Sequence, residues 1–93
     1  MKSARDWTSP LNTPAELGAA LRAQRKAQGI TLEHLSGLSG LGMRFLSELE
    51  RGKATAELGK ALEVAELLGL RCYLMPRSES PTLTKASAHA EKS

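Results

Sequence analysis

The sequence predicts an all-α domain that ends in one short β-strand. Residues 13–75 contain helix start and stop signals that divide them into four short helical segments. One run within them, residues 70–75, alternates apolar and polar side chains with the period of two that is typical of a strand. Residues 1–12 and 76–93 are polar and carry no sustained apolar period, so we expect a flexible N-terminal arm and a disordered C-terminal tail.

The first helix is expected over residues 14–28, because its start signal is complete. Thr13 can accept a hydrogen bond from a free N–H of the first turn, and Glu16 can accept one from the cap residue. Pro14 suits the first helical position, and Gly29 marks the end. The apolar residues expected to face inward are Leu17, Ala20, Leu21 and Ala27.

Two shorter helices are expected on either side of a glycine-rich break. Thr31 is the expected cap of the second helix. The residues of this helix expected to face inward are Leu35 and Leu38. Residues 37–42 contain three glycines, and each glycine in a helix interior costs roughly 1 kcal/mol relative to alanine. The helical period resumes at Met43 and stops at Gly52. The apolar residues of this third helix are Phe45, Leu46 and Leu49.

The fourth helix is expected to begin at a Thr55 cap and to end at Gly69. Its apolar residues follow the i, i+3, i+4, i+7 pattern of a helix with one buried face. The residues of that face are Leu58, Ala61, Leu62, Ala65 and Leu68.

The predicted strand follows at once and stops before Pro76. It consists of Leu70, Arg71, Cys72, Tyr73, Leu74 and Met75, and Cys72 is expected to be a small buried hydrophobe. A lone strand leaves its backbone N–H and C=O groups unpaired. The simplest partner is the same strand of a second copy, antiparallel across a two-fold axis, so we expect a homodimer. The alternative is that residues 70–75 are a structureless tail.

The second and third helices, joined by a tight glycine-containing turn, have the shape of a helix-turn-helix. The third helix, about 42–50, would then lie in a major groove of DNA with its first residues at the base edges. Arg44 can donate to two acceptors on guanine, and Met43 suits an apolar contact such as a thymine methyl. Gly42 lets the N–H groups of the helix N-terminus approach a phosphate.

The positive charge is concentrated in this part of the chain. The whole sequence has a net charge of +3, from 13 Lys and Arg against 10 Asp and Glu. Residues 22–53 hold three acidic residues and six basic ones, namely Arg22, Arg25, Lys26, Arg44, Arg51 and Lys53. Residues 56–70, by contrast, hold one lysine and three glutamates. Clustered positive charge favours binding to nucleic acid, because phosphate contacts release counterions.

Enzymatic, metal-dependent and membrane functions find no support in the sequence. Its 93 residues include no glycine-rich phosphate loop, no His-Glu-x-x-His and no nucleophile with both a base and an orienting group. One cysteine and two distant histidines do not make a zinc site. No apolar run approaches the roughly 20 residues of a membrane span, and the N-terminus lacks an apolar signal segment. We expect a cytoplasmic protein, nucleoid-associated when bound to DNA, that is not an enzyme and uses no metal or cofactor.

Several runs in the helical region carry a family resemblance. They are RKAQGIT at residues 25–31, FLSELERGK at 45–53 and ELGKALEVAELLGL at 57–70. These runs resemble the Cro/lambda-repressor type of helix-turn-helix, and among its members the HipB-type antitoxins. The resemblance covers residues 14–75.

The resemblance implies a lambda-repressor-like four-helix domain whose C-terminal strand pairs across a homodimer. It implies a repressor that binds an inverted-repeat operator in double-stranded DNA, represses its own operon and acts as the antitoxin of a HipA-type serine/threonine kinase toxin. Carried over by position, it implies a structural ion pair between Arg25 and Glu50 and base reading by Met43 and Arg44. The residues that it places at phosphates are Ser47, Arg51 and Lys53. Arg22 and Lys26, one turn apart on the first helix, are further phosphate candidates or a solvated face.

The sequence departs from the family at Leu32, where a glutamine is usual, and at Gly42, where serine or threonine is frequent. Leu32 favours a second interpretation, a protein–protein interaction module that keeps the fold and neutralises a partner without specific DNA binding. Trp7, a lone large aromatic residue in the N-terminal arm, is the candidate partner anchor. The operator sequence remains open, as does the route of neutralisation, whether direct blockage of the kinase, locking of its domains or a third component.

Overall fold

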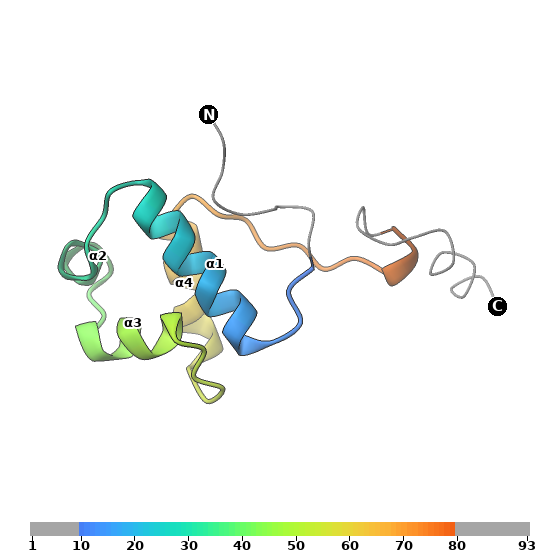
Figure 1. The fold of residues 1–93 in the computed structure, drawn as a ribbon, viewed down its shortest axis with the longest axis horizontal. Coiled ribbons are helices and arrows are strands. Elements are labelled where there is room, and N and C mark those ends of the chain that lie inside the picture. The colour runs from blue at the N-terminus through green and yellow to red at the C-terminus, as the bar shows by residue number, and fades with distance from the viewer. Residues whose placement is uncertain (1–9, 80–93) are drawn as a thin grey trace.

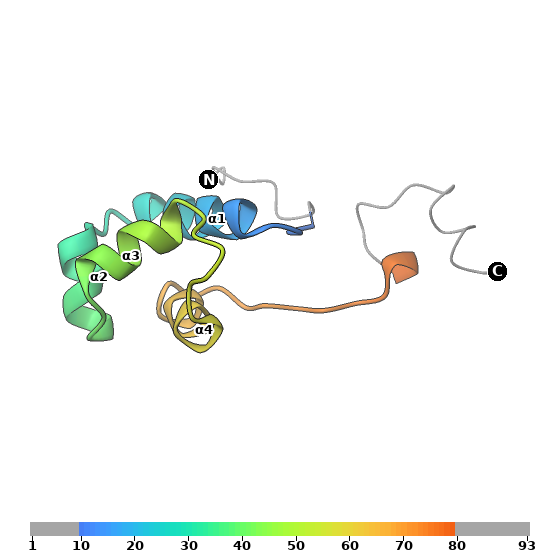
Figure 2. The same cartoon turned by 90° about the horizontal axis from the view of Figure 1, so that it is seen from below.

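Four α-helices follow one another in the computed structural model, which describes residues 10–79. They are α1 (Pro14–Ala27), α2 (Leu32–Ser39), α3 (Met43–Glu50) and α4 (Leu58–Leu67), followed by a short 3₁₀ turn at Arg77–Glu79. Figure 1 shows α2 and α3 beside α1 and α4 behind it, and Figure 2 shows α4 below α1 in the view turned by 90°. The all-α fold with a helix-turn-helix is therefore confirmed. Residues 1–9 and 80–93, including Trp7 and most of the predicted arm and tail, lie outside the described residues.

The local signals at the N-termini of α1 and α2 act as predicted. Thr13 Oγ1 accepts a hydrogen bond from Glu16 N at 3.1 Å, and a Glu16 carboxylate oxygen accepts one from Thr13 N at 3.1 Å. Thr31 Oγ1 accepts a hydrogen bond from His34 N at 3.0 Å. These two capping arrangements satisfy N–H groups that have no partner inside a helix, which is why both helices begin where the sequence indicates.

The core lies where the four helices meet, and it corrects four predicted inward positions. Its buried residues are Leu21, Leu35, Leu46, Leu49, Ala61, Val64, Ala65 and Leu68. The four that are exposed instead are Ala27, Leu38, Leu58 and Leu62. In α4 the predicted residues Ala61 and Ala65 are buried, as is Leu68 at the cap, and Val64 is buried in place of Leu58 and Leu62. In α2, Leu35 is fully buried, whereas Leu38 is about half exposed.

The start of α4 also differs from the prediction, because Thr55 does not cap it. The helix begins at Leu58 after Glu57, with no hydrogen bond from a side chain at the cap. Residues 53–56 form a turn closed by a 3.2 Å hydrogen bond from Ala56 N to Lys53 O, and Ala56 packs against the core. That packing places Thr55 on the exposed turn, outside the helix.

Three helices end in the same turn, the Schellman motif, in which the chain folds back onto the last helical turn. Its long hydrogen bond joins Ile30 N to Arg25 O at 3.1 Å in α1 and Leu70 N to Ala65 O at 2.8 Å in α4. In α3 it joins Lys53 N to Glu48 O at 3.0 Å. Ile30 and Leu70 pack against the core, as is usual for this position. In α3 the same position is occupied by a lysine.

Residues 70–75 form no strand in the structure, which contains a single chain. After Leu70 the chain leaves the helices and runs outward without regular structure (Figures 1 and 2). Cys72 is exposed, contrary to the prediction that it is buried, and Leu74 is fully exposed. The physical reason is that a strand needs a partner, and residues 10–79 contain no second strand to supply one. Pairing with a second copy remains a prediction.

Candidate nucleic-acid interface

The first turn of α3 projects from the domain while its remaining turns are fixed. Leu46, Leu49 and Glu50 are buried, whereas Met43 is exposed and the side chain of Arg44 is 91% exposed. Gly42 is the cap residue of α3, and because it has no side chain it cannot accept a hydrogen bond from the N–H groups of the first turn. The predicted base-reading residues therefore share one exposed helix end.

A close backbone contact with α1 sets the position of α3. A Cβ atom added at Gly18 of α1 would lie 2.6 Å from the carbonyl oxygen of Glu50. At Gly52, just after α3, the backbone has φ +88°, and an added Cβ would lie 2.6 Å from Ala15 Cα. Both sites require glycine for the two segments to touch. Sequence reasoning missed Gly18, although a glycine inside an otherwise strong helical pattern was the available signal.

A buried ion pair joins the same two helices. The Arg25 guanidinium donates from Nε to Glu50 Oε2 at 2.6 Å and from Nη2 to Glu50 Oε1 at 2.9 Å. Its Nη1 donates to the carbonyl oxygen of Ile30 at 2.7 Å. The hydrogen bonds with Glu50 raise the pKa of Arg25 above its ordinary value, against the opposing effect of burial. Because the pair is bidentate, it fixes the last turn of α3 in orientation as well as in distance from α1.

The remaining polar residues of α3 are linked to each other. Arg51 Nη1 donates to Ser47 Oγ at 2.6 Å, which joins two of the predicted phosphate contacts. Glu48, which sequence reasoning did not single out, accepts a hydrogen bond from Arg44 Nε at 3.3 Å and one from Lys53 Nζ at 3.0 Å. The hydrogen bond from Lys53 and then that from Arg44 lower the pKa of Glu48. The i, i+4 spacing of Arg44 and Glu48 was the signal in the sequence.

Comparisons with known proteins agree with this geometry. Residues 21–73 match the model of the helix-turn-helix family HTH_3. The chain belongs to this helix-turn-helix family. It is 46% identical over 69 residues to the HTH-type transcriptional regulator y4mF of Sinorhizobium fredii, a match that covers 74% of this chain and 91% of the relative. It is 38% identical over 63 residues to y4dL, an HTH-type transcriptional regulator of the same organism, covering 68% of this chain and 32% of y4dL.

A solved structure, that of the HipB–O4 20mer complex, contains the same fold. The TM-score is 0.68 at 20% identity, and the match covers 73% of this chain and 96% of the other. The predicted resemblance to HipB and the lambda-repressor type is therefore confirmed at the level of fold and family. The chain is a transcriptional regulator of the helix-turn-helix type, and this assignment points to a DNA-binding regulator rather than an enzyme.

The local structure explains the two positions at which this helix-turn-helix protein departs from the family pattern. Leu32, which stands where glutamine is usual, is half-buried and packs against the core. Gly42 begins α3 in an extended conformation that needs no side chain.

The two further phosphate candidates, Arg22 and Lys26, are both exposed on α1.

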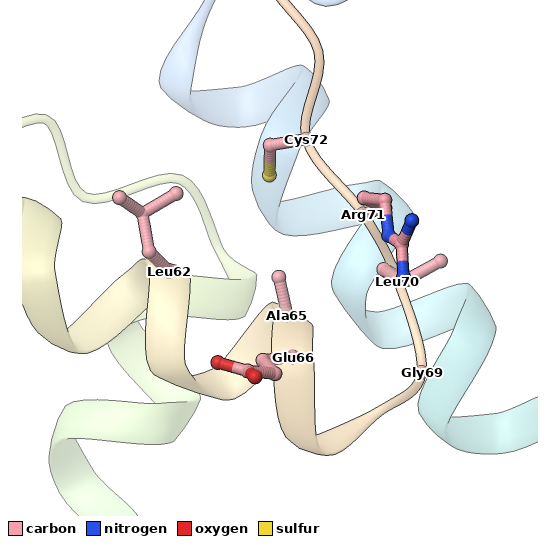
Figure 3. Close-up of a pocket in the computed structure, with 7 residues that line it drawn as sticks. All are labelled: Leu62, Ala65, Glu66, Gly69, Leu70, Arg71 and Cys72. Atoms are coloured by element: carbon pink, nitrogen blue, oxygen red, sulfur yellow. The ribbon is translucent and has the colours of Figure 1, made fainter.

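A second surface of the regulator lies away from α3, between α4 and the segment after it. This hollow is lined by Leu62, Ala65, Glu66, Gly69, Leu70, Arg71 and Cys72 (Figure 3). The sulfur of Cys72 points from the segment into the space beside α4. Among residues 10–79 no group of His, Cys, Asp and Glu side chains is arranged to hold a metal ion. No helix in this part of the chain is long and apolar enough to cross a membrane.

Proposed function

We propose that this regulator is a sequence-specific repressor that binds double-stranded DNA at an inverted-repeat operator. The observation that carries the proposal is the exposed first turn of α3, with Met43 and Arg44 in solvent on a helix held rigidly against α1. Reading a major groove requires such a helix, because its first residues must reach the base edges in a fixed register. The likeness to HipB, a protein solved in complex with the O4 20mer, supports DNA as the ligand.

In this proposal the start of α3 reads bases. Arg44 donates to two acceptors of a guanine, and Met43 makes an apolar contact with a neighbouring base. Gly42 allows the N-terminus of α3 to approach a phosphate. The residues assigned to phosphate contacts, all on α1, α3 or the turn after α3, are Arg22, Lys26, Ser47, Arg51 and Lys53.

We assign residues 13–75 to a domain for both DNA binding and dimerisation, flanked by a flexible arm at 1–12 and a disordered tail at 76–93. The dimer contact is assigned to the C-terminal surface, which we define as Leu62, Leu70, Cys72 and Leu74. Antiparallel pairing of residues 70–75 with the same residues of a second copy would satisfy their backbone groups and cover this apolar surface. The two α3 helices would then meet half-sites one helical turn apart, roughly 34 Å.

The proposed biological role is that of an antitoxin in a HipA-type toxin–antitoxin system. The resemblance of residues 45–53 and 57–70 to HipB-type antitoxins, together with the HipB-like fold, supports this role. The partner is a HipA-like serine/threonine kinase toxin, the repressed operon is its own, and Trp7 is the candidate anchor on the partner. The protein acts in the cytoplasm and is associated with the nucleoid when bound to DNA. Co-purification with the kinase encoded beside it, and relief of that kinase's toxicity on co-expression, would test the role. A neighbouring gene unrelated to kinases would contradict it.

Replacement of Arg44 by alanine tests the reading assignment. We expect Arg44→Ala to lose about 1–3 kcal/mol of binding to the preferred site and to relax the preference at one base step of each half-site. The measurement is selection of binding sites from random DNA, followed by titration of the selected site. Lys26→Ala is the matched control, because loss of a phosphate contact weakens binding to all sequences alike. An unchanged base preference in Arg44→Ala would remove Arg44 from the reading residues.

The alternative function is a protein–protein interaction module without specific DNA binding. The exposed apolar C-terminal surface favours it, since a partner protein could cover those side chains. Salt dependence separates the two functions. DNA binding through several phosphate contacts falls steeply between low and moderate salt, whereas an apolar protein contact changes little.

A further inference from the structure

Glu48 lies between two of the cations assigned to DNA. One carboxylate oxygen, Oε2, accepts from Arg44 Nε at 3.3 Å, and the other, Oε1, accepts from Lys53 Nζ at 3.0 Å. The side chain of Glu48 is 24% exposed, against 91% for Arg44 and 50% for Lys53. The carboxylate is thus held near the helix surface while both cations remain accessible. A carboxylate in this position orients the side chains of Arg44 and Lys53 and offsets part of their positive charge.

The turn after α3 builds the contact with Lys53. In the Schellman motif the residue after the glycine lies over the helical residue five positions earlier, and an apolar contact usually joins the two. In α4 those residues are Leu70 and Ala65, both apolar and at least partly buried. In α3 they are Lys53 and Glu48, so an ion pair replaces the apolar contact. The backbone hydrogen bond between the same two residues, 3.0 Å from Lys53 N to Glu48 O, holds them together.

The contact with Arg44 determines which edge of the guanidinium is available. A guanidinium can present two parallel N–H bonds to guanine either from Nη1 and Nη2 or from Nε and one Nη. Glu48 occupies Nε, which leaves the Nη1–Nη2 edge at the outer end of the side chain. Glu48 therefore selects one of the two ways in which Arg44 can meet a base.

The other cations of the surface are not neutralised in this way. Arg51 donates to the uncharged hydroxyl of Ser47, and no ion pair within residues 10–79 involves Arg22 or Lys26. Of the cations assigned to DNA, only Arg44, the predicted base reader, and Lys53 contact the Glu48 carboxylate. On DNA a carboxylate at this place weakens attraction to any phosphate, whatever the sequence.

We propose that Glu48 is a positioning residue that sets DNA specificity: it presents the Nη1–Nη2 edge of Arg44 to the base and restrains Arg44 and Lys53 from indiscriminate phosphate binding. This inference rests on the proposed function. Specificity is a ratio of two affinities. Glu48 raises this ratio through Arg44, which it directs to the base at the right site and keeps from a phosphate at other sites. Its restraint of Lys53 lowers both affinities alike and so changes the salt dependence but not the ratio.

The variant Glu48→Gln removes the charge and keeps the shape. We expect tighter binding to random-sequence DNA, a slope of log K against log salt that is steeper by up to about 2, and a specific-to-random affinity ratio reduced about tenfold. Glu63→Gln, the same change at an exposed residue of α4, is the matched control and is expected to leave the ratio unchanged. In Arg44→Ala/Glu48→Gln the second change is expected to have no further effect on the base preference, because its target is absent.

The outcomes separate this inference from the function on which it rests. If the unaltered protein shows no preference for any DNA sequence, the proposed function fails. If it shows a preference that depends on Arg44, and Glu48→Gln lowers the melting temperature but leaves the affinity ratio and the salt slope unchanged, Glu48 serves only the stability of α3 and this inference is overturned. A reduced ratio in Glu48→Gln that persists undiminished when Arg44 is absent would also overturn it.

Discussion

Two regions of this regulator differ in whether one chain completes them. The α1–α3 contact, formed by Gly18, Arg25, Glu50 and Gly52, has its backbones touching and its buried charges paired. The C-terminal surface leaves apolar side chains in solvent and the backbone of residues 70–75 without a regular partner. The difference indicates that the first region determines the fold of the single chain, whereas the second region would be completed only in the proposed dimer. Substitutions in the two regions should therefore change different quantities.

Breaking the buried ion pair should have the largest effect on the stability of the single chain. We expect Arg25→Met to lower the free energy of unfolding by about 3–5 kcal/mol, because the Glu50 carboxylate is left buried without its partner. Denaturation by urea, followed by circular dichroism, measures this loss. The double variant Arg25→Met/Glu50→Met is the control, since it removes both charges and should recover much of the loss. A double variant as unstable as Arg25→Met alone would show that packing, rather than the unpaired charge, is responsible.

Adding one methyl group at Gly18 should have the next largest effect. The added carbon of Gly18→Ala would meet carbonyl oxygens of α3, and backbone cannot move aside as a side chain can. We expect a loss of about 1–3 kcal/mol in the free energy of unfolding, despite the better helix propensity of alanine. Gly37→Ala in α2 is the matched control, because no atom lies within 4 Å of its added carbon. That variant should gain about 0.5–1 kcal/mol. Equal effects at the two sites would contradict the close approach of α1 and α3.

The same comparison explains what could be predicted from the sequence. The ends of α1, α2 and α3 depend on capping residues and glycines within a few positions, so local reasoning located them to within about a residue or two. The start of α4 depends on the packing of Ala56. Whether Val64 or Leu62 faces inward in α4 is decided only by tertiary contacts. The contact of Gly18 with α3 joins residues far apart in sequence, so spacing could not reveal it. The alternation of residues 70–75 could not decide between a strand and an irregular segment, because residues 10–79 contain no strand to pair with them.

The boundary between the two regions lies where α1 meets the end of α4. The side-chain amides of Gln24 and Gln28 both donate to the carbonyl oxygen of Leu68, at 3.0 Å and 2.6 Å. Because the two donors share one acceptor, we expect Gln28→Ala to cost only about 0.5 kcal/mol of unfolding free energy and the double alanine variant about 1–1.5 kcal/mol. Thermal denaturation of the three proteins measures the difference. If Gln28→Ala lowered the unfolding free energy as much as the double variant does, the hydrogen bond from Gln24 would be insufficient to hold the end of α4.

The smallest effect on the single chain should come from the C-terminal surface, where the effect on assembly should be large. Leu74 is fully exposed, so Leu74→Asp should change the unfolding free energy of the isolated chain by less than about 0.5 kcal/mol. In the proposed dimer, however, each copy would bring a charge into a paired apolar strand, which should shift the protein from dimer to monomer at micromolar concentration. Sedimentation equilibrium measures this shift. Leu38→Asp makes the same change at an exposed leucine of α2 and should leave the dimer intact. If the unaltered protein is itself a monomer, a different partner would have to cover the apolar side chains of residues 70–75. That result would favour the interaction module over the dimeric repressor.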